Sequence, residues 1–412
     1  MTGASDDDPS GIATYAQAGA QFGFGLLWAA LLTFPLMASV QEICDRTALA
    51  TGKGLGELAV KRFSRRARPL LAVLLAALVA ANALNIAADL VAVGSGMNLL
   101  HAGPSWLWAL LTGVLITVAV VGGSFSMIAR AFKLLCLALL AYVVEVFLVH
   151  ASWGTILANT FVPHLHLTRA YVALLIAVLG TTISPYLFFW QSAHRMEELR
   201  DAPEGGSRAV TLKEHTPRSA RAKQRSGRMD VFSGMAFSNV VMWAIIVVTA
   251  QTLATHGQHD IQSAAQAASA LTPIAGRFAT TLFALGFIGS GILAVPVLAG
   301  AGAAGMSGLL HKEWGFSRSI RKAPVFYGLV ALGTIGGAAL SLVHVNPIKL
   351  LVIVATINGL IAAPFLILVM LISGDRRLMG TYRNGRLASI LGWVTVAVMA
   401  AAAVALVLPS VT

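Results

Sequence analysis

Long apolar stretches constrain this chain more than any other feature of its sequence. Each is close to the roughly 20 residues that a helix needs to cross a membrane. The ten stretches are Gly25–Val40, Pro69–Val93, Trp106–Gly122, Phe132–Val149, Tyr171–Gln191, Val231–Leu253, Pro273–Ala301, Val325–Val343, Leu350–Ile372 and Ala388–Leu408. The pattern predicts an all-α, polytopic membrane protein, because helices satisfy their own backbone hydrogen bonds in lipid.

The first stretch extends further than one crossing needs. No charged residue occurs from Ile12 to Val40, 29 residues that would form a helix of about 43 Å. This length is too great for one crossing and too small for two. We therefore expect Gly11–Phe22 to form a half-length helix 1 ahead of a full second span, which gives eleven spans.

Composition excludes the soluble classes of protein. Hydrophobic residues make up 57% of the 412 residues and charged residues only 11%, against roughly 25% charged in soluble domains. The two cysteines, Cys44 and Cys136, lie in apolar surroundings and imply no disulfide framework. A soluble enzyme, a disordered protein and a disulfide-rich secreted domain are all excluded.

The positive charges predict the orientation. The net charge is +12, and all but three of the 29 lysines and arginines lie in loops that follow even-numbered spans. Basic loops face the cytoplasm, so we expect a multi-pass protein of the inner (plasma) membrane with these loops cytoplasmic. The same distribution argues against a nucleic-acid partner. The longest basic loop, 197–230, is rich in Pro, Gly, Ser and Arg and is expected to be a flexible linker; contact with phospholipids is the alternative.

Two apolar helices are interrupted by proline beside small polar residues. The interruptions are Asp6–Gly11 and, in the middle of the sixth span, Thr181–Tyr186. A backbone carbonyl freed by proline is tolerated in lipid only where protein or a water-filled cavity satisfies it. Paired interruptions in two halves of a chain point to a transporter site. They predict one transport domain, 1–412, with the five-plus-five inverted-repeat (LeuT-like) fold and broken helices 1 and 6. Its parts would be repeat one at 1–150, repeat two at 170–373 and an extra helix at 388–408.

The interruptions offer only oxygen ligands. Asp8 supplies a carboxylate, Thr181 and Ser184 supply hydroxyls, and carbonyls are freed around Pro9. Oxygen ligands suit hard divalent cations such as Mg²⁺ and Mn²⁺. The alternative is that both prolines are plain kinks whose backbone groups are satisfied by Ser and Thr.

At these residues the chain resembles the Nramp family of divalent-metal transporters. The stretch Asp8–Gly52 is similar to the first two helices of the family, whose hallmark is Asp-Pro-Gly-Asn; here Gly11 replaces the Asn. The family's sixth-helix pattern Ala-x-x-Met-Pro-His has Ser184 in place of the Met and Tyr186 in place of the His. The resemblance implies uptake of a divalent cation by alternating access, with the metal as cargo and no cofactor.

The replaced methionine favours one branch of that family. A thioether is the soft ligand that favours transition metals, and its loss makes the chain most similar to the Nramp-related branch that carries Mg²⁺ and Mn²⁺. We expect a metal site of Asp8, Gly11, Thr181 and Ser184, whose small side chains leave room for a partly hydrated ion.

Proton coupling stays open at this stage. Family members use the replaced His together with acids in helix 3, where Asp89 matches one acid and Arg321 and Lys322 are candidate basic partners. An acid within the membrane marks function by default, so Asp89 is either a relay or part of an interhelical hydrogen bond. The candidates for a proton or polar network are Asn82, Asn85, Asp89, Tyr186, Thr356 and Asn358. The last two could instead complete the ion shell.

Three other functions compete with metal transport. An amino-acid or organic-cation carrier of the same fold would want Gly-rich helix N-termini aimed at a carboxylate, whereas the break here carries Asp8. A membrane-embedded enzyme would need a constellation such as HExxH, which the sequence lacks. A scaffold would leave the paired breaks unexplained.

The position of the first break predicts a missing segment. The ligand motif begins at residue 8, so the first half of helix 1 is absent from the sequence. We expect upstream in-frame codons to encode about 10–15 further apolar residues, the length of half a membrane.

Overall fold

A computed structural model describes residues 7–122, 137–148, 152–166, 168–202, 209–343 and 346–407. All regular elements among these residues are helices. Seven helical segments in the described ranges are long and apolar enough to cross a membrane. Two shorter apolar helices, α6 (Ser105–Val121) and α16 (Pro324–Leu340), accompany them. The predicted all-α, multi-pass membrane protein is confirmed.

The bundle is built from helices of unequal length. Besides α6 and α16 these are α2 (Pro9–Phe22), α3 (Leu27–Thr51), α5 (Arg68–Leu99), α8 (Leu140–Val146), α10 (Arg169–Thr182), α11 (Pro185–Asp201), α12 (Pro217–Thr252), α15 (Ala279–Leu309), α17 (Pro347–Ser373) and α19 (Arg386–Val407). Short helices in the connections are α4 (Leu55–Arg62), α9 (Trp153–Phe161), α13 (Ala264–Ser269), α14 (Thr272–Ala275) and α18 (Arg376–Met379). Single 3₁₀ turns are η1 (Gly23–Leu26), η2 (Arg65–Ala67), η3 (Leu137–Leu139), η5 (Leu212–Glu214), η6 (Ala254–His256), η7 (Gly276–Phe278) and η8 (Gly380–Tyr382).

Capping residues followed by proline fix where several helices begin. Asp8 caps α2, Thr216 caps α12 and Asn346 caps α17, each accepting a hydrogen bond from a backbone N–H of the first turn. Proline is the next residue in all three cases. It suits this position because the N–H that it lacks would have no partner in the helix.

The expected half-length first helix and the interruption of the sixth span are both present, and at the first Asp-Pro motif Asp8 caps the start of α2. The charge-free segment at the start of the chain divides into α2 and α3 at Gly23, whose φ of +56° suits glycine. The sixth span divides into α10 and α11 at Ile183 and Ser184, which leave the helical conformation just before Pro185. The half helix and the broken sixth helix are therefore confirmed.

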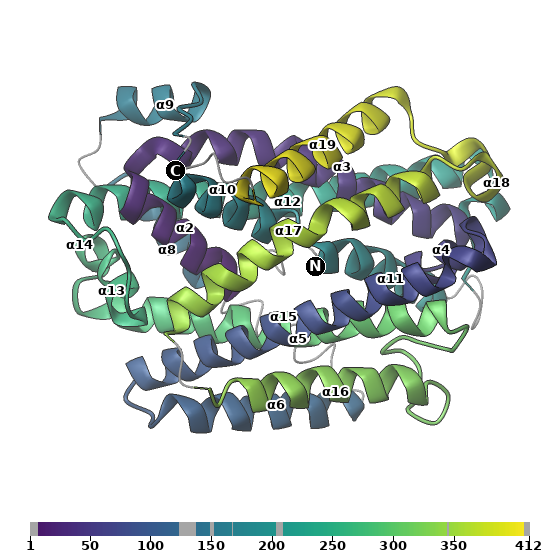
Figure 1. The fold of residues 1–412 in the computed structure, drawn as a ribbon, viewed down its shortest axis with the longest axis horizontal. Coiled ribbons are helices and arrows are strands. Elements are labelled where there is room, and N and C mark those ends of the chain that lie inside the picture. The colour runs from purple at the N-terminus through teal and green to yellow at the C-terminus, as the bar shows by residue number, and fades with distance from the viewer. Residues whose placement is uncertain are drawn as a thin grey trace.

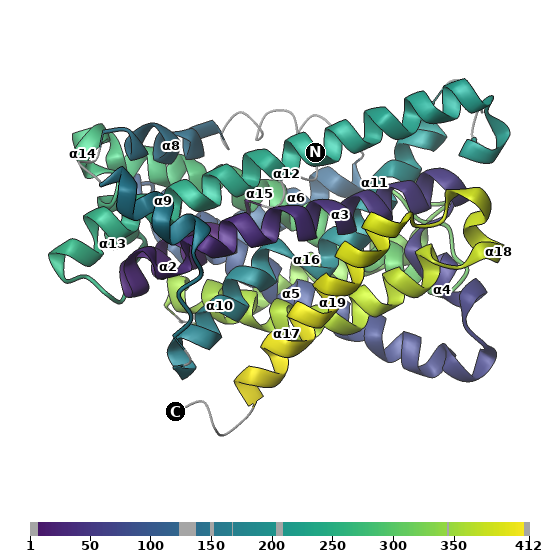
Figure 2. The same ribbon diagram turned by 90° about the horizontal axis from the view of Figure 1, so that it is seen from above.

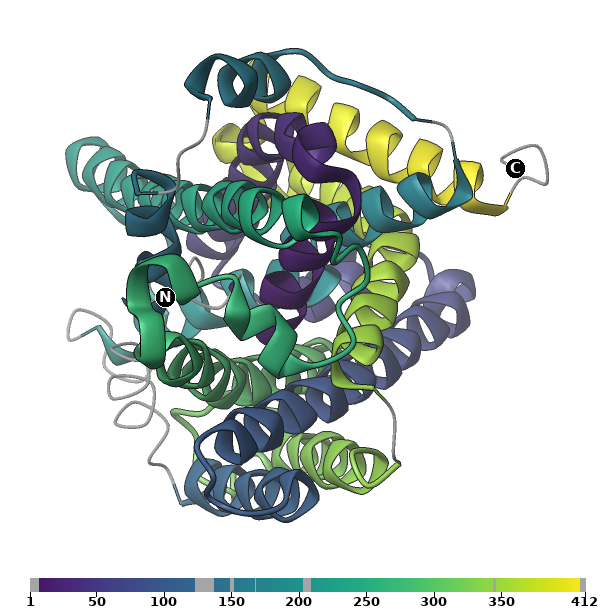
Figure 3. The ribbon, with the colours of Figure 1, turned by 90° about the vertical axis from the view of Figure 1, so that its left-hand side faces the viewer.

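Helices from the two halves of the chain interleave. In Figure 1, α5 and α15 lie side by side with α6 and α16 outside them, while α3 and α12 form the opposite side and α17 crosses between. A Cβ added at Gly180 of α10 would lie 2.2 Å from the carbonyl oxygen of Ala355 in α17, so these two helices touch through their backbones. Figures 2 and 3 place α19 at the periphery of the bundle.

The two ends of the bundle differ in character. One end carries α9, α13 and α14, and the other carries α4, α18 and the first turns of α12 (Figure 1). We call the second the basic end, because arginines such as Arg62, Arg228 and Arg376 lie there.

Two expectations need correction or restriction. The expectation of a flexible linker over 197–230 is wrong for both ends of this segment, because α11 continues to Asp201 and α12 already begins at Pro217. The Thr216 cap and the proline after it start a helix despite the polar composition. Of the expected fifth span, Phe132–Val149, residues 132–136 and 149 lie outside the described residues, and η3 and α8 occupy most of the rest.

Candidate metal site

Asp8 lies at the start of α2, where that helix begins inside the bundle. Its side chain is buried, with 1% of the residue exposed. Oδ1 accepts hydrogen bonds from Ser10 Oγ at 2.6 Å and from the Gly11 backbone N–H at 2.9 Å. Oδ2 accepts a hydrogen bond from Tyr186 Oη at 3.1 Å. Both breaks therefore contribute to the surroundings of this carboxylate.

The two breaks also meet through their hydroxyl groups. Ser10 Oγ lies 3.3 Å from Thr181 Oγ1 in the last turn of α10. A Cβ at Gly11 would lie 3.2 Å from that same Thr181 oxygen and 3.2 Å from the ring of Tyr15. The absence of a side chain at Gly11 thus lets α2 and α10 approach closely.

Ser184 is buried beside this group but bonds elsewhere. Its Oγ donates to the carbonyls of Gly180 at 2.5 Å and Thr181 at 3.0 Å, which are freed at the end of α10. This is the behaviour expected of a serine that satisfies a proline break. Ser184 is fully buried and directly precedes Pro185 and Tyr186 in the sequence.

The sequence reasoning did not select two neighbouring polar residues, Ser10 and Asp7. Ser10 binds Asp8 directly, and Asp7 is 1% exposed with Oδ1 accepting from Ser238 Oγ of α12 at 2.9 Å. Asp7 Oδ2 is buried and has no hydrogen-bond partner within the described ranges. Two sequence features could have indicated them: the run of three aspartates before Pro9, and a serine inside the apolar part of α12.

The expected polar network divides into separate parts. Asn85 and Asn358 exchange amide hydrogen bonds of 3.1 and 3.2 Å, and Asn82 donates to the carbonyl of Leu298 at 2.8 Å. Asp89 is fully buried, and neither carboxylate oxygen has a hydrogen-bond partner among the described residues. The expected connection of Asp89 to Asn82 and Asn85 is therefore absent from the described structure.

Thr356 also lies apart from Asp8. Its Oγ1 donates to the carbonyl of Val352 at 2.9 Å, and the residue lines a cavity of ≈ 330 Å³ together with Gln17 and Lys349. Asn358 bonds Asn85, so neither residue completes a shell around Asp8 in this structure. The contacts of Asn358 fit the alternative role, an interhelical hydrogen bond.

Buried acids nevertheless gather near the first break. A Cβ at Gly291 of α15 would lie 3.1 Å from the carbonyl of Asp89 and 3.4 Å from Pro9 Cγ, so α5, α15 and the start of α2 meet there. No Lys or Arg within the described chain forms an ion pair with Asp7, Asp8 or Asp89. Arg321 and Lys322 are exposed in the turn before α16. A buried carboxyl group without a basic partner is either protonated and neutral or compensated by another positive charge, such as a bound cation.

The donors present are oxygens. Among the described residues no three His, Cys, Asp or Glu side chains gather closely enough to hold a metal. An ion at Asp8 would therefore use hydroxyls, backbone carbonyls or water besides the carboxylate. This mixture suits a hard cation rather than a soft one.

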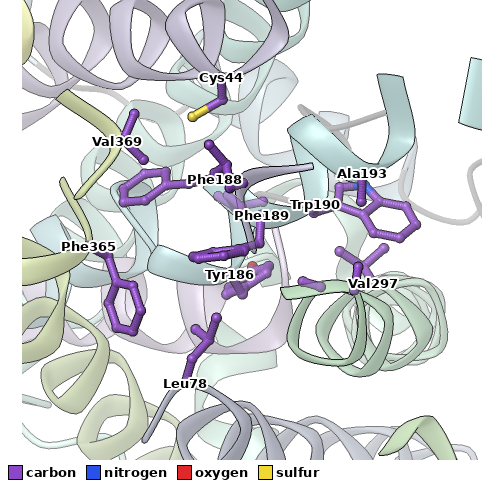
Figure 4. Packing of buried hydrophobic residues seen from close by; sticks show 14 of the residues in the cluster. Cys44, Leu78, Tyr186, Phe188, Phe189, Trp190, Ala193, Val297, Phe365 and Val369 are labelled. Atoms are coloured by element: carbon purple, nitrogen blue, oxygen red, sulfur yellow. The ribbon is translucent and has the colours of Figure 1, made fainter. Parts of the chain in front are cut away.

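The site is closed toward the basic end. Figure 4 shows apolar side chains converging around Tyr186: Cys44 of α3, Leu78 of α5, Phe188 and Phe189 of α11, Val297 of α15 and Phe365 of α17. Beyond this layer, Asp45 Oδ1 accepts from Arg195 Nε at 2.6 Å and from Gln191 Nε2 at 2.8 Å. The layer and the ion pair together separate Asp8 from the basic end.

Comparison with known proteins identifies the family. The model of the family "Natural resistance-associated macrophage protein-like", abbreviated Nramp, matches residues 1–409. The chain belongs to the Nramp family. The divalent metal cation transporter MntH of Verminephrobacter eiseniae is 28% identical over 390 residues, covering 92% of this chain and 80% of the relative. MntH of Aeromonas hydrophila is 28% identical over 408 residues, covering 95% and 90%.

Solved structures of a manganese transporter share the fold. The crystal structure of the Eremococcus coleocola manganese transporter, in complex with an aromatic bis-isothiourea substituted compound, matches with a TM-score of 0.71 at 16% identity. The match covers 98% of this chain and 83% of that one. The predicted inverted-repeat fold is confirmed. Divalent metal cation transport is confirmed as the general function, the metal being cargo rather than cofactor, and a membrane-embedded enzyme is excluded.

Proposed function

We propose that this Nramp-family protein takes up hard divalent cations, Mg²⁺ or Mn²⁺, by alternating access around Asp8, Gly11, Thr181 and Ser184. The observation that carries the proposal is the all-oxygen donor set where α2 and α10 meet, with a serine hydroxyl in place of a thioether. The relatives named as divalent metal cation transporters and the manganese transporter of the same fold support the substrate class.

Mg²⁺ fits this arrangement because it retains water when bound. It dehydrates reluctantly and is commonly held by one or two carboxylates plus waters. Asp8 provides one such carboxylate, and Ser10, Thr181 and Tyr186 provide hydroxyls that can orient bound water. A partly hydrated Mg²⁺ therefore need not contact all of the proposed ligands directly.

The orientation follows from the basic end. We place it in the cytoplasm, since basic loops remain on that side of the inner membrane. In this orientation the apolar layer around Tyr186 and the Asp45–Arg195 pair form the inner barrier. Opening that barrier would release the ion into the cell.

Proton coupling is proposed through the acids that lack basic partners. Asp89, with neither carboxylate oxygen hydrogen-bonded in the described structure, is the candidate to carry a proton in symport with the metal. Tyr186, which donates to Asp8 where the family has His, would transmit the state of the metal site.

Uptake into proteoliposomes tests the proposed ion and its ligand together. We expect the wild-type protein to move Mg²⁺ and Mn²⁺, and Asp8→Asn to abolish both, because the substitution removes the only carboxylate among the proposed ligands. Asp201→Asn, an exposed residue at the end of α11, is the matched control and should transport normally. Mg²⁺ and Mn²⁺ uptake by Asp8→Asn at the control rate would contradict the proposed site. An internal pH dye in the same vesicles would show whether protons accompany the metal.

A further inference from the structure

A cavity at the basic end collects positive charge outside the metal site. It has a volume of ≈ 620 Å³ and lies between α3, α12 and the turn that leads into α19. Its lining contains four arginines and one acid: Arg46, Arg228, Arg383, Arg386 and Glu42. One carboxylate therefore faces four guanidinium groups.

That carboxylate is already engaged. Arg46 donates Nε to Glu42 at 3.1 Å and Nη1 to the carbonyl of Tyr382 at 2.8 Å, and its side chain is only 9% exposed. Arg228 reaches the same Glu42 oxygen at 3.5 Å, but its side chain is 64% exposed. Arg46 and Glu42 thus form the neutral floor of the cavity, and the charge of Arg228 is only weakly compensated.

Arg383 and Arg386 have no such partner. Both are exposed at the cavity, and no ion pair or side-chain hydrogen bond engages either guanidinium in the described part of the chain. Arg386 is also the first residue of the 22-residue helix α19, and Gly385, Leu387 and Ala388 line the cavity with it. The free N–H groups and positive end of a helix N-terminus favour an anion at that position.

The cavity opens onto apolar surface that suits lipid tails. Leu387 is 70% exposed, Ile390 59% and Trp393 45%, and these residues follow one another along α19 from the cavity. Phe232, 38% exposed, lines the cavity from α12. Charged and lipid-facing surfaces therefore meet at its mouth, and Figure 2 shows α19 on the outside of the bundle there.

We infer that this cavity binds the phosphate headgroup of an anionic phospholipid, whose acyl chains lie along the exposed face of α19. Arg228, Arg383, Arg386 and the first turn of α19 supply the charge that recognises the phosphodiester. A lipid bound here joins the peripheral α19 to α3 and α12. The inference is independent of which cation the protein carries.

Native mass spectrometry of the purified full-length protein, titrated with lipid in detergent, tests this site. Phosphatidylglycerol should be retained and phosphatidylcholine should not. The double variant Arg383→Gln/Arg386→Gln should weaken phosphatidylglycerol binding roughly 30-fold. This figure assumes that each of the two arginines makes the usual contribution of a basic residue at an anionic lipid surface. The matched control is Arg65→Gln/Arg66→Gln, two exposed arginines at the same end, and should bind like the wild type.

Two results would overturn the inference. An equal loss in both double variants, or equal retention of the two lipids, would show that no specific site exists. Soluble glycerol 3-phosphate that binds as tightly as phosphatidylglycerol and is lost only in the cavity variant would identify a soluble phosphate as the ligand instead.

Discussion

Breaking the Asp45–Arg195 ion pair is expected to open the basic end and expose Cys44. The pair links α3 to α11 with a 2.6 Å hydrogen bond, and Asp45 is buried, its side chain 3% exposed. A Cβ at Gly227 would lie 2.5 Å from Asp45 Oδ2, so α12 packs directly on the pair. Cys44, the neighbouring residue, is fully buried in the layer of Figure 4.

The expected size of the effect follows from this geometry. Asp45→Asn retains the shape but removes the charge that Arg195 and Gln191 bind. A hydrogen bond to a charged group contributes roughly 1.5–3 kcal/mol, so the open population should rise roughly 10- to 150-fold. Asp230 lies 3.9 Å from the same arginine but is 59% exposed. Asp230→Asn should therefore change the population less than about fivefold.

Alkylation of Cys44 by N-ethylmaleimide in proteoliposomes, in a Cys136→Ser background, measures the opening. Arg195→Gln provides the necessary second variant, since loss of a positive charge and loss of a negative charge affect thiolate formation in opposite directions. Faster alkylation in both Asp45→Asn and Arg195→Gln would show opening. Opposite changes in the two variants, or a rate for Asp45→Asn equal to that of Asp230→Asn, would refute the reasoning.

Three further predictions concern packing and buried polar groups. Gly180→Ala should destabilise the protein severely, because its Cβ would lie 2.2 Å from the carbonyl of Ala355; the loss would appear as a lower Tm in detergent, and a wild-type Tm would contradict the close packing of α10 on α17. Asn358→Ala should cost about 1–3 kcal/mol by leaving Asn85 unpaired, and Asn85→Ala/Asn358→Ala should cost less than the sum of the two single changes; additive losses in the same unfolding assay would exclude coupling. Asp89→Asn should preserve or raise the Tm, because it removes an unpaired buried carboxylate, yet it should reduce metal-driven proton uptake; unchanged proton flux would remove Asp89 from the proposed relay.

The breaks were predictable from sequence because their causes are local. Pro9 and Pro185 each remove a backbone donor, and the small polar residues beside them can satisfy what is freed. Placing Asp8, Gly11 and Thr181 together needed only the inference that the two breaks face each other. The 3.3 Å approach of Ser10 to Thr181 agrees with that inference.

The remaining contacts depend on long-range packing. The partner of Asn85 is Asn358, 273 positions along the chain, and no local pattern indicates it. Asp45 illustrates the same limit, since it pairs with the distant Arg195 and not with the adjacent Arg46, which pairs with Glu42. The prediction of a flexible linker failed for a different reason. It rested on the polar composition of the segment and overlooked the local helix-start signal at Thr216 and Pro217.

Metal selectivity most directly tests the central claim, that an all-oxygen site carries a hard cation. Substitutions at Ser184 make this test possible. We would measure uptake of Mg²⁺, Mn²⁺ and Cd²⁺ into proteoliposomes by the wild type, Ser184→Met and Ser184→Ala. The all-oxygen site predicts that the wild type carries Mg²⁺ and Mn²⁺ in preference to Cd²⁺. Ser184→Met, and not Ser184→Ala, should shift the preference toward Cd²⁺, because only the former adds a soft ligand. A wild-type protein that carries Cd²⁺ but not Mg²⁺ would contradict the account.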